Sequence, residues 1–144
     1  MRERRSLVNR LRRAIDDGQM ELRYQPKVSL ASGAIVAAEA LVRWRDPDSG
    51  LVMPAEFVPL AEDAGLIERL GRNVLIEACT TLAGWQKSGM PFLRVAVNVS
   101  AREIARKTFF DDLVRILENT GVEPDALELE ITESAIMELS LIHI

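Results

Sequence analysis

The segment Ala34-Ile-Val-Ala-Ala-Glu-Ala-Leu-Val-Arg-Trp44 predicts a β-strand whose two faces differ. Because successive side chains of a strand point to opposite sides, one face of this segment is apolar and the other carries charge. The apolar face receives Ala38, Ala40, Val42 and Trp44, and the opposite face receives Ala37, Glu39, Leu41 and Arg43. The pattern predicts a strand that buries only its apolar face under helices.

Two later segments repeat this alternation. In Arg94-Val-Ala-Val-Asn-Val-Ser100 the valines oppose Asn98 and Ser100, and in Leu127-Glu-Leu-Glu-Ile-Thr132 the apolar residues oppose Glu128 and Glu130. A parallel sheet is normally buried on both faces, so these polar groups must be solvated, paired or bound to a metal. Periodicity alone leaves a solvated sheet face and a functional site equally open. Small polar groups where a strand ends favour the site.

The rest of the chain alternates between helical and extended patterns. We expect a hairpin that turns at Ala31-Ser-Gly33, and Pro26 predicts that its first strand is an edge strand or is interrupted. Helices are expected over residues 4–17, from 54, over 66–87, over 109–119 and from 134, with further strands over 93–99 and 127–131. This order predicts an α/β fold with a parallel sheet covered by helices.

Composition excludes several classes of function. The 144 residues are 48% hydrophobic and 28% charged, with a net charge of −4, which argues against coating DNA or RNA polymers. No apolar run is long enough to span a bilayer and the first residues lack a signal-peptide core, so a cytoplasmic domain is expected. The single cysteine, Cys79, excludes a disulfide or a zinc cluster and is expected to lie in the core.

Residues 1–19 are expected to form a basic amphipathic helix or linker at the start of the domain. Leu7, Leu11 and Ile15 recur every four residues, and Gly18 ends the pattern. The opposite face carries Arg4, Arg5, Arg10, Arg12 and Arg13. Contact with nucleic acid or anionic lipid is one interpretation of this face, and the neighbouring acidic residues favour the other, a solvated linker helix.

The polar strand ends offer only oxygen ligands. Glu39, Asn98 and Glu130 would suit Mg²⁺ or Mn²⁺ better than zinc or copper. Arg43, on the same strand face as Glu39, carries a fork-shaped donor that suits a phosphate. A hard cation beside a phosphate-binding arginine indicates phosphoryl chemistry.

Five ordered motifs resemble the EAL family, the bacterial phosphodiesterases that hydrolyse cyclic di-GMP. They are Tyr24-Gln-Pro26, Glu39-Ala-Leu41 with Val42-Arg43, Pro54-Ala-Glu-Phe57 with Leu60-Ala-Glu62, Val97-Asn-Val-Ser100, and Glu128-Leu-Glu-Ile-Thr-Glu-Ser134. The intervals are 59 residues from Glu39 to Asn98 and 32 from Asn98 to Glu130. The resemblance implies a TIM-like (β/α)₈ barrel with an early antiparallel strand.

The resemblance also implies roles for individual residues. Glu39, Asn98 and Glu130 match ligands of the first of two Mg²⁺ or Mn²⁺ ions, and Gln25, Leu41 and Arg43 match contacts to cyclic di-GMP. Glu133 matches a glutamate that steadies a loop beside the metals, and a favourable charge at a helix N-terminus is the alternative for it. The implied reaction is two-metal hydrolysis of cyclic di-GMP to linear pGpG.

The matching segment is expected to be only the N-terminal part of such a domain. A barrel of this class needs about 250 residues, so we expect truncation at about half its length, over residues 20–138. The family's later Asp pair, Lys, Glu and Gln are absent, no catalytic set is complete, and this chain is expected to be inactive. Residues 139–144 resemble a translated sequencing adaptor and are expected to be a non-native tail, which leaves His143 without a role.

Two further functions stay open. A degenerate domain would bind cyclic di-GMP as a non-catalytic sensor, and an ordinary α/β domain would merely solvate its polar strand ends. For the parent protein, the family resemblance implies cyclic di-GMP as ligand, a homodimer of the intact domain, and a fused sensory or diguanylate cyclase domain. A tether to the membrane would then lie outside this chain.

Overall fold

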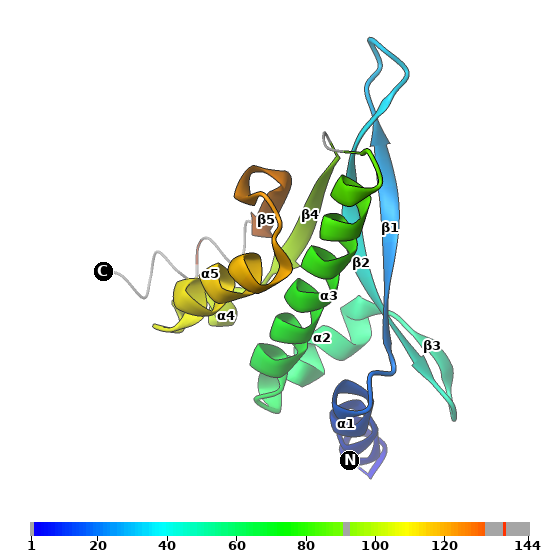
Figure 1. Cartoon of the computed structure of the whole chain (residues 1–144). Coiled ribbons are helices and arrows are strands. Elements are labelled where there is room, and N and C mark those ends of the chain that lie inside the picture. The colour runs from blue at the N-terminus through cyan, green and yellow to red at the C-terminus, as the bar shows by residue number, and fades with distance from the viewer. Residues whose placement is uncertain (1, 91–92, 132–136, 138–144) are drawn as a thin grey trace.

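The computed structural model describes residues 2–90, 93–131 and 137, and its centre is a five-stranded sheet (Figure 1). The strands are β1 (Met20–Val28), β2 (Ile35–Asp46), β3 (Gly50–Val52), β4 (Arg94–Val99) and β5 (Leu127–Ile131). The helices are α1 (Arg2–Asp16), α2 (Pro54–Asp63), α3 (Ile67–Lys87), α4 (Ala101–Ala105), α5 (Phe109–Thr120) and the 3₁₀ turn η1 (Pro124–Ala126). The sheet order is β1-β2-β4-β5, with β3 paired to β2.

The first two strands form the expected antiparallel hairpin. β1 is an edge strand of the described sheet, and its register shifts between Lys27 and Val28, one residue beyond Pro26. Proline has no amide hydrogen for a sheet ladder, which explains its place on an edge strand. Gly33 has a φ of 71°, a left-handed conformation that glycine adopts without a steric cost. The tip of this hairpin extends beyond the end of α3 (Figure 1).

The later strands are parallel, as the alternation of helices and strands predicts. β4 pairs in parallel with β2 on one side and with β5 on the other. α3 packs along one face of this sheet, where Ala78, Cys79 and Leu82 are fully buried. Val95, Val97 and Val99 also face this core, so the predicted apolar side of β4 is confirmed.

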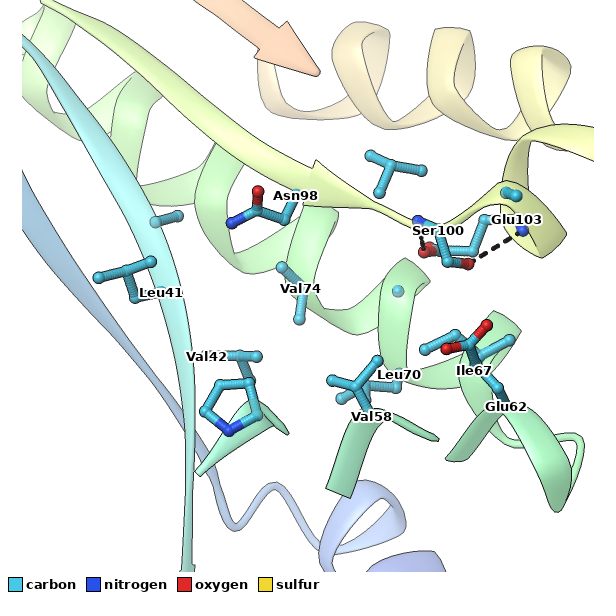
Figure 2. Close-up of a pocket in the computed structure, with 15 residues that line it drawn as sticks. Leu41, Val42, Val58, Glu62, Ile67, Leu70, Val74, Asn98, Ser100 and Glu103 are labelled. Carbon is cyan, nitrogen blue, oxygen red and sulfur yellow. Dashed lines mark hydrogen bonds between the residues drawn. The ribbon is translucent and has the colours of Figure 1, made fainter. Parts of the chain in front are cut away.

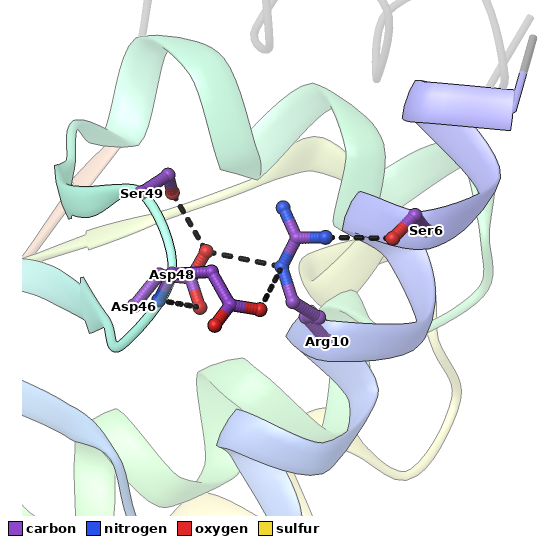
Figure 3. Close-up of polar contacts among 5 residues, drawn as sticks. All are labelled: Ser6, Arg10, Asp46, Asp48 and Ser49. Carbon is purple, nitrogen blue, oxygen red and sulfur yellow. Dashed lines mark hydrogen bonds and ion pairs between the residues drawn. The ribbon is translucent and has the colours of Figure 1, made fainter.

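α1 packs against the rest of the fold through the apolar stripe seen in the sequence. Leu11, Ala14 and Ile15 are buried in a second hydrophobic cluster that also contains Trp44 and Phe57. The arginine face is not uniformly solvated. Arg10 is only partly exposed and its Nε donates a hydrogen bond to the buried Asp46 at 3.0 Å, which ties α1 to the end of β2 (Figure 3).

Three short elements have no counterpart in the sequence prediction: β3, α4 and η1. Each spans three to five residues, which is too short for a hydrophobic period to reveal it. The helix expected from residue 134 and the tail at 139–144 lie outside the described residues. Within the described residues, no helix is both long and apolar enough to cross a membrane.

Candidate metal and substrate site

The three residues that the sequence pattern assigns to a metal lie on one face of three neighbouring strands. Glu39 is on β2, Asn98 on β4 and Glu130 on β5. Asn98 lies opposite Glu130 in the parallel register, and Glu39 lies opposite Ala96, two residues before Asn98. The Asn98 side-chain amide donates a hydrogen bond from Nδ2 to Glu39 Oε2 at 3.2 Å. The sheet thus brings together residues that are far apart in the sequence.

The donor set fits a hard divalent cation. Asn98 directs its nitrogen toward Glu39, and no described residue donates a hydrogen bond to Asn98 Oδ1, so that oxygen is available as a ligand. Two carboxylates and one amide oxygen are ligands that Mg²⁺ and Mn²⁺ prefer. In the described part of the chain, no three His, Cys, Asp or Glu side chains are grouped to hold a metal, so the set depends on the amide of Asn98.

Lys27 reaches this face from β1 and was not singled out from the sequence. Its Nζ lies 3.2 Å from Glu130 Oε1. The hydrogen bond to Glu130 and the charge of that carboxylate raise the pKa of Lys27, and the Glu39 and Glu128 carboxylates add to the effect. Strand alternation could have indicated Lys27, because residues 25 and 27 share the face of β1 that lies beside Glu39.

The ion pair between Lys27 and Glu130 also indicates that the sheet is curved. β1 and β5 are the two ends of the order β1-β2-β4-β5. Side chains stand roughly perpendicular to a sheet, so contact between the outermost strands requires the sheet to curve toward this face. The candidate metal ligands therefore lie on the concave side, as expected for the inner wall of a barrel.

The three candidate substrate residues share this face but differ in their surroundings. Gln25 lies opposite Glu39 in the antiparallel register and its side chain is exposed. Leu41 lines a cavity together with Asn98. Arg43 donates from Nη1 to the carbonyl oxygen of Val42 at 2.9 Å, so its guanidinium contacts its own strand. Gln25 and Leu41 thus lie beside the candidate metal ligands. Arg43 lies two residues beyond Leu41 on the same face of β2.

A cavity of about 380 Å³ opens beside Asn98 (Figure 2). Leu41 and Asn98 lie at one end of it, and Ser100 and Glu103 lie at the other. Its wall is mostly apolar and includes Val58 of α2 together with side chains of α3. This volume falls within the range of small-molecule sites, and an apolar wall with few polar groups is their usual character.

Ser100 and Glu103 form a capping box that sequence reasoning missed. The Ser100 amide donates to Glu103 Oε2 at 2.9 Å, and the Glu103 amide donates to Ser100 Oγ at 3.2 Å. The Glu103 side chain is buried, and this burial raises its pKa despite the hydrogen bonds from Ser100. The signal was present as Ser-Ala-Arg-Glu, the S-x-x-E pattern that begins many helices.

Two sequence predictions remain, one inside and one outside the described residues. Cys79 is fully buried, and its burial raises the thiol pKa to about 11, so it is an unreactive core residue as expected. Glu133, the predicted loop-stabilising residue, lies outside the described residues.

The chain matches the model of the EAL domain over residues 8–141. It is 40% identical over 132 residues to the cyclic di-GMP phosphodiesterase PdeR of Escherichia coli. It is 41% identical over 135 residues to MucR of Pseudomonas aeruginosa, a bifunctional diguanylate cyclase/cyclic di-GMP phosphodiesterase. These alignments cover 92% and 94% of the chain but only 20% of each relative, so the chain spans about a fifth of their length.

A solved structure shows that this similarity extends to the fold. The complex of PaMucR phosphodiesterase with c-di-GMP superposes with a TM-score of 0.89 and 39% sequence identity, covering 95% of this chain and 56% of the other. This similarity confirms the predicted fold class, part of a TIM-like barrel with an early antiparallel strand. The chain belongs to the EAL domain family and corresponds to about half of such a domain.

Proposed function

We propose that this chain is the N-terminal part of a domain that hydrolyses cyclic di-GMP to linear pGpG in bacterial second-messenger signalling. The observation that supports the proposal most directly is that Glu39, Asn98 and Glu130 share one concave face of the sheet, where the Asn98 amide is hydrogen-bonded to Glu39. The similarity of this chain to PdeR and to the PaMucR complex with c-di-GMP supports cyclic di-GMP as the proposed substrate.

In this proposal each residue has a separate task. Glu39, Asn98 and Glu130 hold one of two Mg²⁺ or Mn²⁺ ions. When bound, such ions activate a water molecule and neutralise phosphate oxygens. Arg43 binds the substrate phosphate by turning its guanidinium away from the Val42 carbonyl, while Gln25 and Leu41 contact the remainder of the nucleotide. Glu133 steadies the adjacent loop.

The isolated chain is proposed to be inactive because it supplies the ligands of one metal and lacks a complete catalytic set. The parent protein is proposed to act in the cytoplasm and to form a homodimer through the intact domain. A fused diguanylate cyclase domain is supported by MucR, which combines both activities. A sensory domain is the other proposed fusion.

A chimera tests the proposal directly. Residues 8–131 of this chain would replace the corresponding segment of the PaMucR phosphodiesterase domain, which the TM-score of 0.89 supports as a geometric match. We expect the chimera to convert cyclic di-GMP to pGpG, measured by chromatography with Mg²⁺ or Mn²⁺ present. E39Q and N98A chimeras should lose at least about 100-fold in rate, since each removes one metal-ligand group.

The other outcomes of this experiment separate the alternatives. A chimera that binds cyclic di-GMP without hydrolysing it would favour the sensor function. A chimera that folds and whose nucleotide and metal binding are unchanged by E39Q and N98A would show that these residues are merely solvated, and would contradict the proposal. The 144-residue chain should yield no pGpG under the same conditions.

A further inference from the structure

Each carboxylate of the candidate metal site already has a hydrogen-bond donor within the described chain. Glu39 accepts from the neutral Asn98 amide, whereas Glu130 accepts from the charged Lys27 ammonium, and both distances are 3.2 Å. An amide can keep its nitrogen on Glu39 while its oxygen binds a cation. An ammonium offers no oxygen, so its position beside Glu130 conflicts with a metal at the same carboxylate.

We propose that Lys27 is a built-in counter-cation of the metal site, which a divalent ion must displace from Glu130 in order to bind. This inference rests on the proposed function, because it takes Glu39, Asn98 and Glu130 as the metal ligands. Lys27 is then a positioning residue that sets the affinity for the first metal and holds Glu130 in place when the metal is absent.

The surrounding charges support a specific role for Lys27. Arg94, the other cation at the β5 side of this face, lies 3.6 Å from Glu128 and so has a separate partner. The side chains of Lys27 and Glu130 are 46% and 35% exposed, so a metal could reach Glu130 from solvent and the released ammonium could be hydrated. The exchange therefore needs no rearrangement of the strands.

The expected size of the effect follows from Coulomb's law. A unit charge about 6 Å from a divalent ion in a water-like dielectric changes its affinity about tenfold, and salt reduces this effect. Removing the charge of Lys27 should therefore tighten metal binding by about that factor at low ionic strength, and by less at high ionic strength.

The test is a Mn²⁺ titration of the 144-residue chain followed by electron paramagnetic resonance, which needs no enzymatic activity. We expect K27M to bind Mn²⁺ about tenfold more tightly than the unmodified chain, and K27R to bind like the unmodified chain. K87M, a change of the same charge at the far end of α3, is the matched control and should leave the affinity unchanged. E130Q should weaken binding strongly.

A second measurement on the metal-free chain tests the ion pair itself. The unfolding free energies of K27M, E130Q and the double variant should be non-additive, because the two side chains share one interaction. Additive effects would overturn the inference, as would equal Mn²⁺ affinities of K27M and the unmodified chain. If E130Q also leaves Mn²⁺ binding unchanged, or if neither the unmodified chain nor K27M binds Mn²⁺ at millimolar concentration, the proposed metal site fails together with the role of Lys27.

Discussion

At the scale of single residues, the buried carboxylate of Glu103 fixes the chain where β4 passes into α4. Its Oε2 accepts a hydrogen bond from the Ser100 amide, and its Oε1 lies against the α3 backbone at Gly71. A Cβ atom at position 71 would collide with Glu103 Oε1. Any larger residue at position 71 would therefore push the Glu103 carboxylate out of its place in the capping box, which favours glycine here although glycine is a poor helix former.

Replacing Gly71 should break this arrangement. In G71A the new methyl group displaces the Glu103 carboxylate and disrupts the capping box, and this loss should exceed the gain in helix propensity, so that the unfolding free energy falls by up to about 1 kcal/mol. G84A is the matched control, since Gly84 lies in the same helix and has open space around its Cβ position. It should stabilise the chain by up to about 1 kcal/mol. Denaturant unfolding measures both, and a stabilised G71A would contradict the packing argument.

The raised pKa of Glu103 predicts a pH dependence of stability. Burial favours the neutral acid in the folded chain, so the folded state binds a proton more tightly than the unfolded state does. The stability of the unmodified chain relative to E103Q should fall as pH rises above the ordinary glutamate value of about 4.5. Unfolding curves of both proteins from about pH 4 to pH 7.5 measure this difference. A difference that stays constant over this range would contradict the assignment to Glu103.

At the scale of elements, Asp46 joins α1 to the strand that carries Glu39. Asp46 is 2% exposed and accepts hydrogen bonds from Arg10 Nε at 3.0 Å, Ser49 Oγ at 2.6 Å and the Asp48 amide at 3.4 Å (Figure 3). Burial raises the pKa of Asp46, and these hydrogen bonds together outweigh it, so the pKa lies below its ordinary value. The ion pair adds a polar link to the apolar packing of α1.

Neutralising this carboxylate should loosen α1. We expect D46N to lower the unfolding free energy by about 1–3 kcal/mol, because hydrogen bonds to a charged, buried partner are lost. D48N is the control: Asp48 is 75% exposed and lies 3.9 Å from Arg10, so its removal should change stability by no more than about 0.5 kcal/mol. Chemical denaturation compares the two variants. Equal effects would show that burial of Asp46 does not matter.

At the scale of the whole molecule, the described half-barrel leaves interaction surfaces uncovered. In the part of the chain that the structure describes, β5 pairs only with β4 and β1 only with β2, so the outer edge of each presents backbone donors and acceptors. The hairpin tip also exposes apolar side chains: Val28, Leu30, Ile35 and Val36. An unpaired edge strand is a template for pairing with another chain.

We expect the 144-residue chain to associate as its concentration rises, with an unpaired edge of the sheet, that of β1 or β5, as the contact. Light scattering after size exclusion measures the mass at each concentration. L30K removes the most exposed apolar side chain of the hairpin tip and leaves the sheet edge intact, so association should persist in this variant. Loss of association in L30K would assign the contact to the hairpin instead, and a monomer at every concentration would contradict both.

The sequence by itself determined the order of the main elements and the side of each strand that is buried. Strand alternation in residues 34–44 and 94–100 depends only on the two-residue period of an extended chain, and the buried Val95, Val97 and Val99 follow it. Two of the three predicted metal ligands, Glu39 and Asn98, share a hydrogen bond across 59 residues, in agreement with the strand alternation that places both on the polar face of the sheet.

The tertiary structure decided which charged residues far apart in the sequence form ion pairs. The pairs Lys27–Glu130 and Arg10–Asp46 join residues 103 and 36 positions apart, and no local periodicity specifies such partners. The sequence indicated an arginine face on α1, but only docking of the helix against Trp44 and Phe57 selected Arg10 for a buried partner. Contacts of this kind depend on how sheet curvature and helix packing bring separate elements together, which is a property of the whole fold rather than of any one segment.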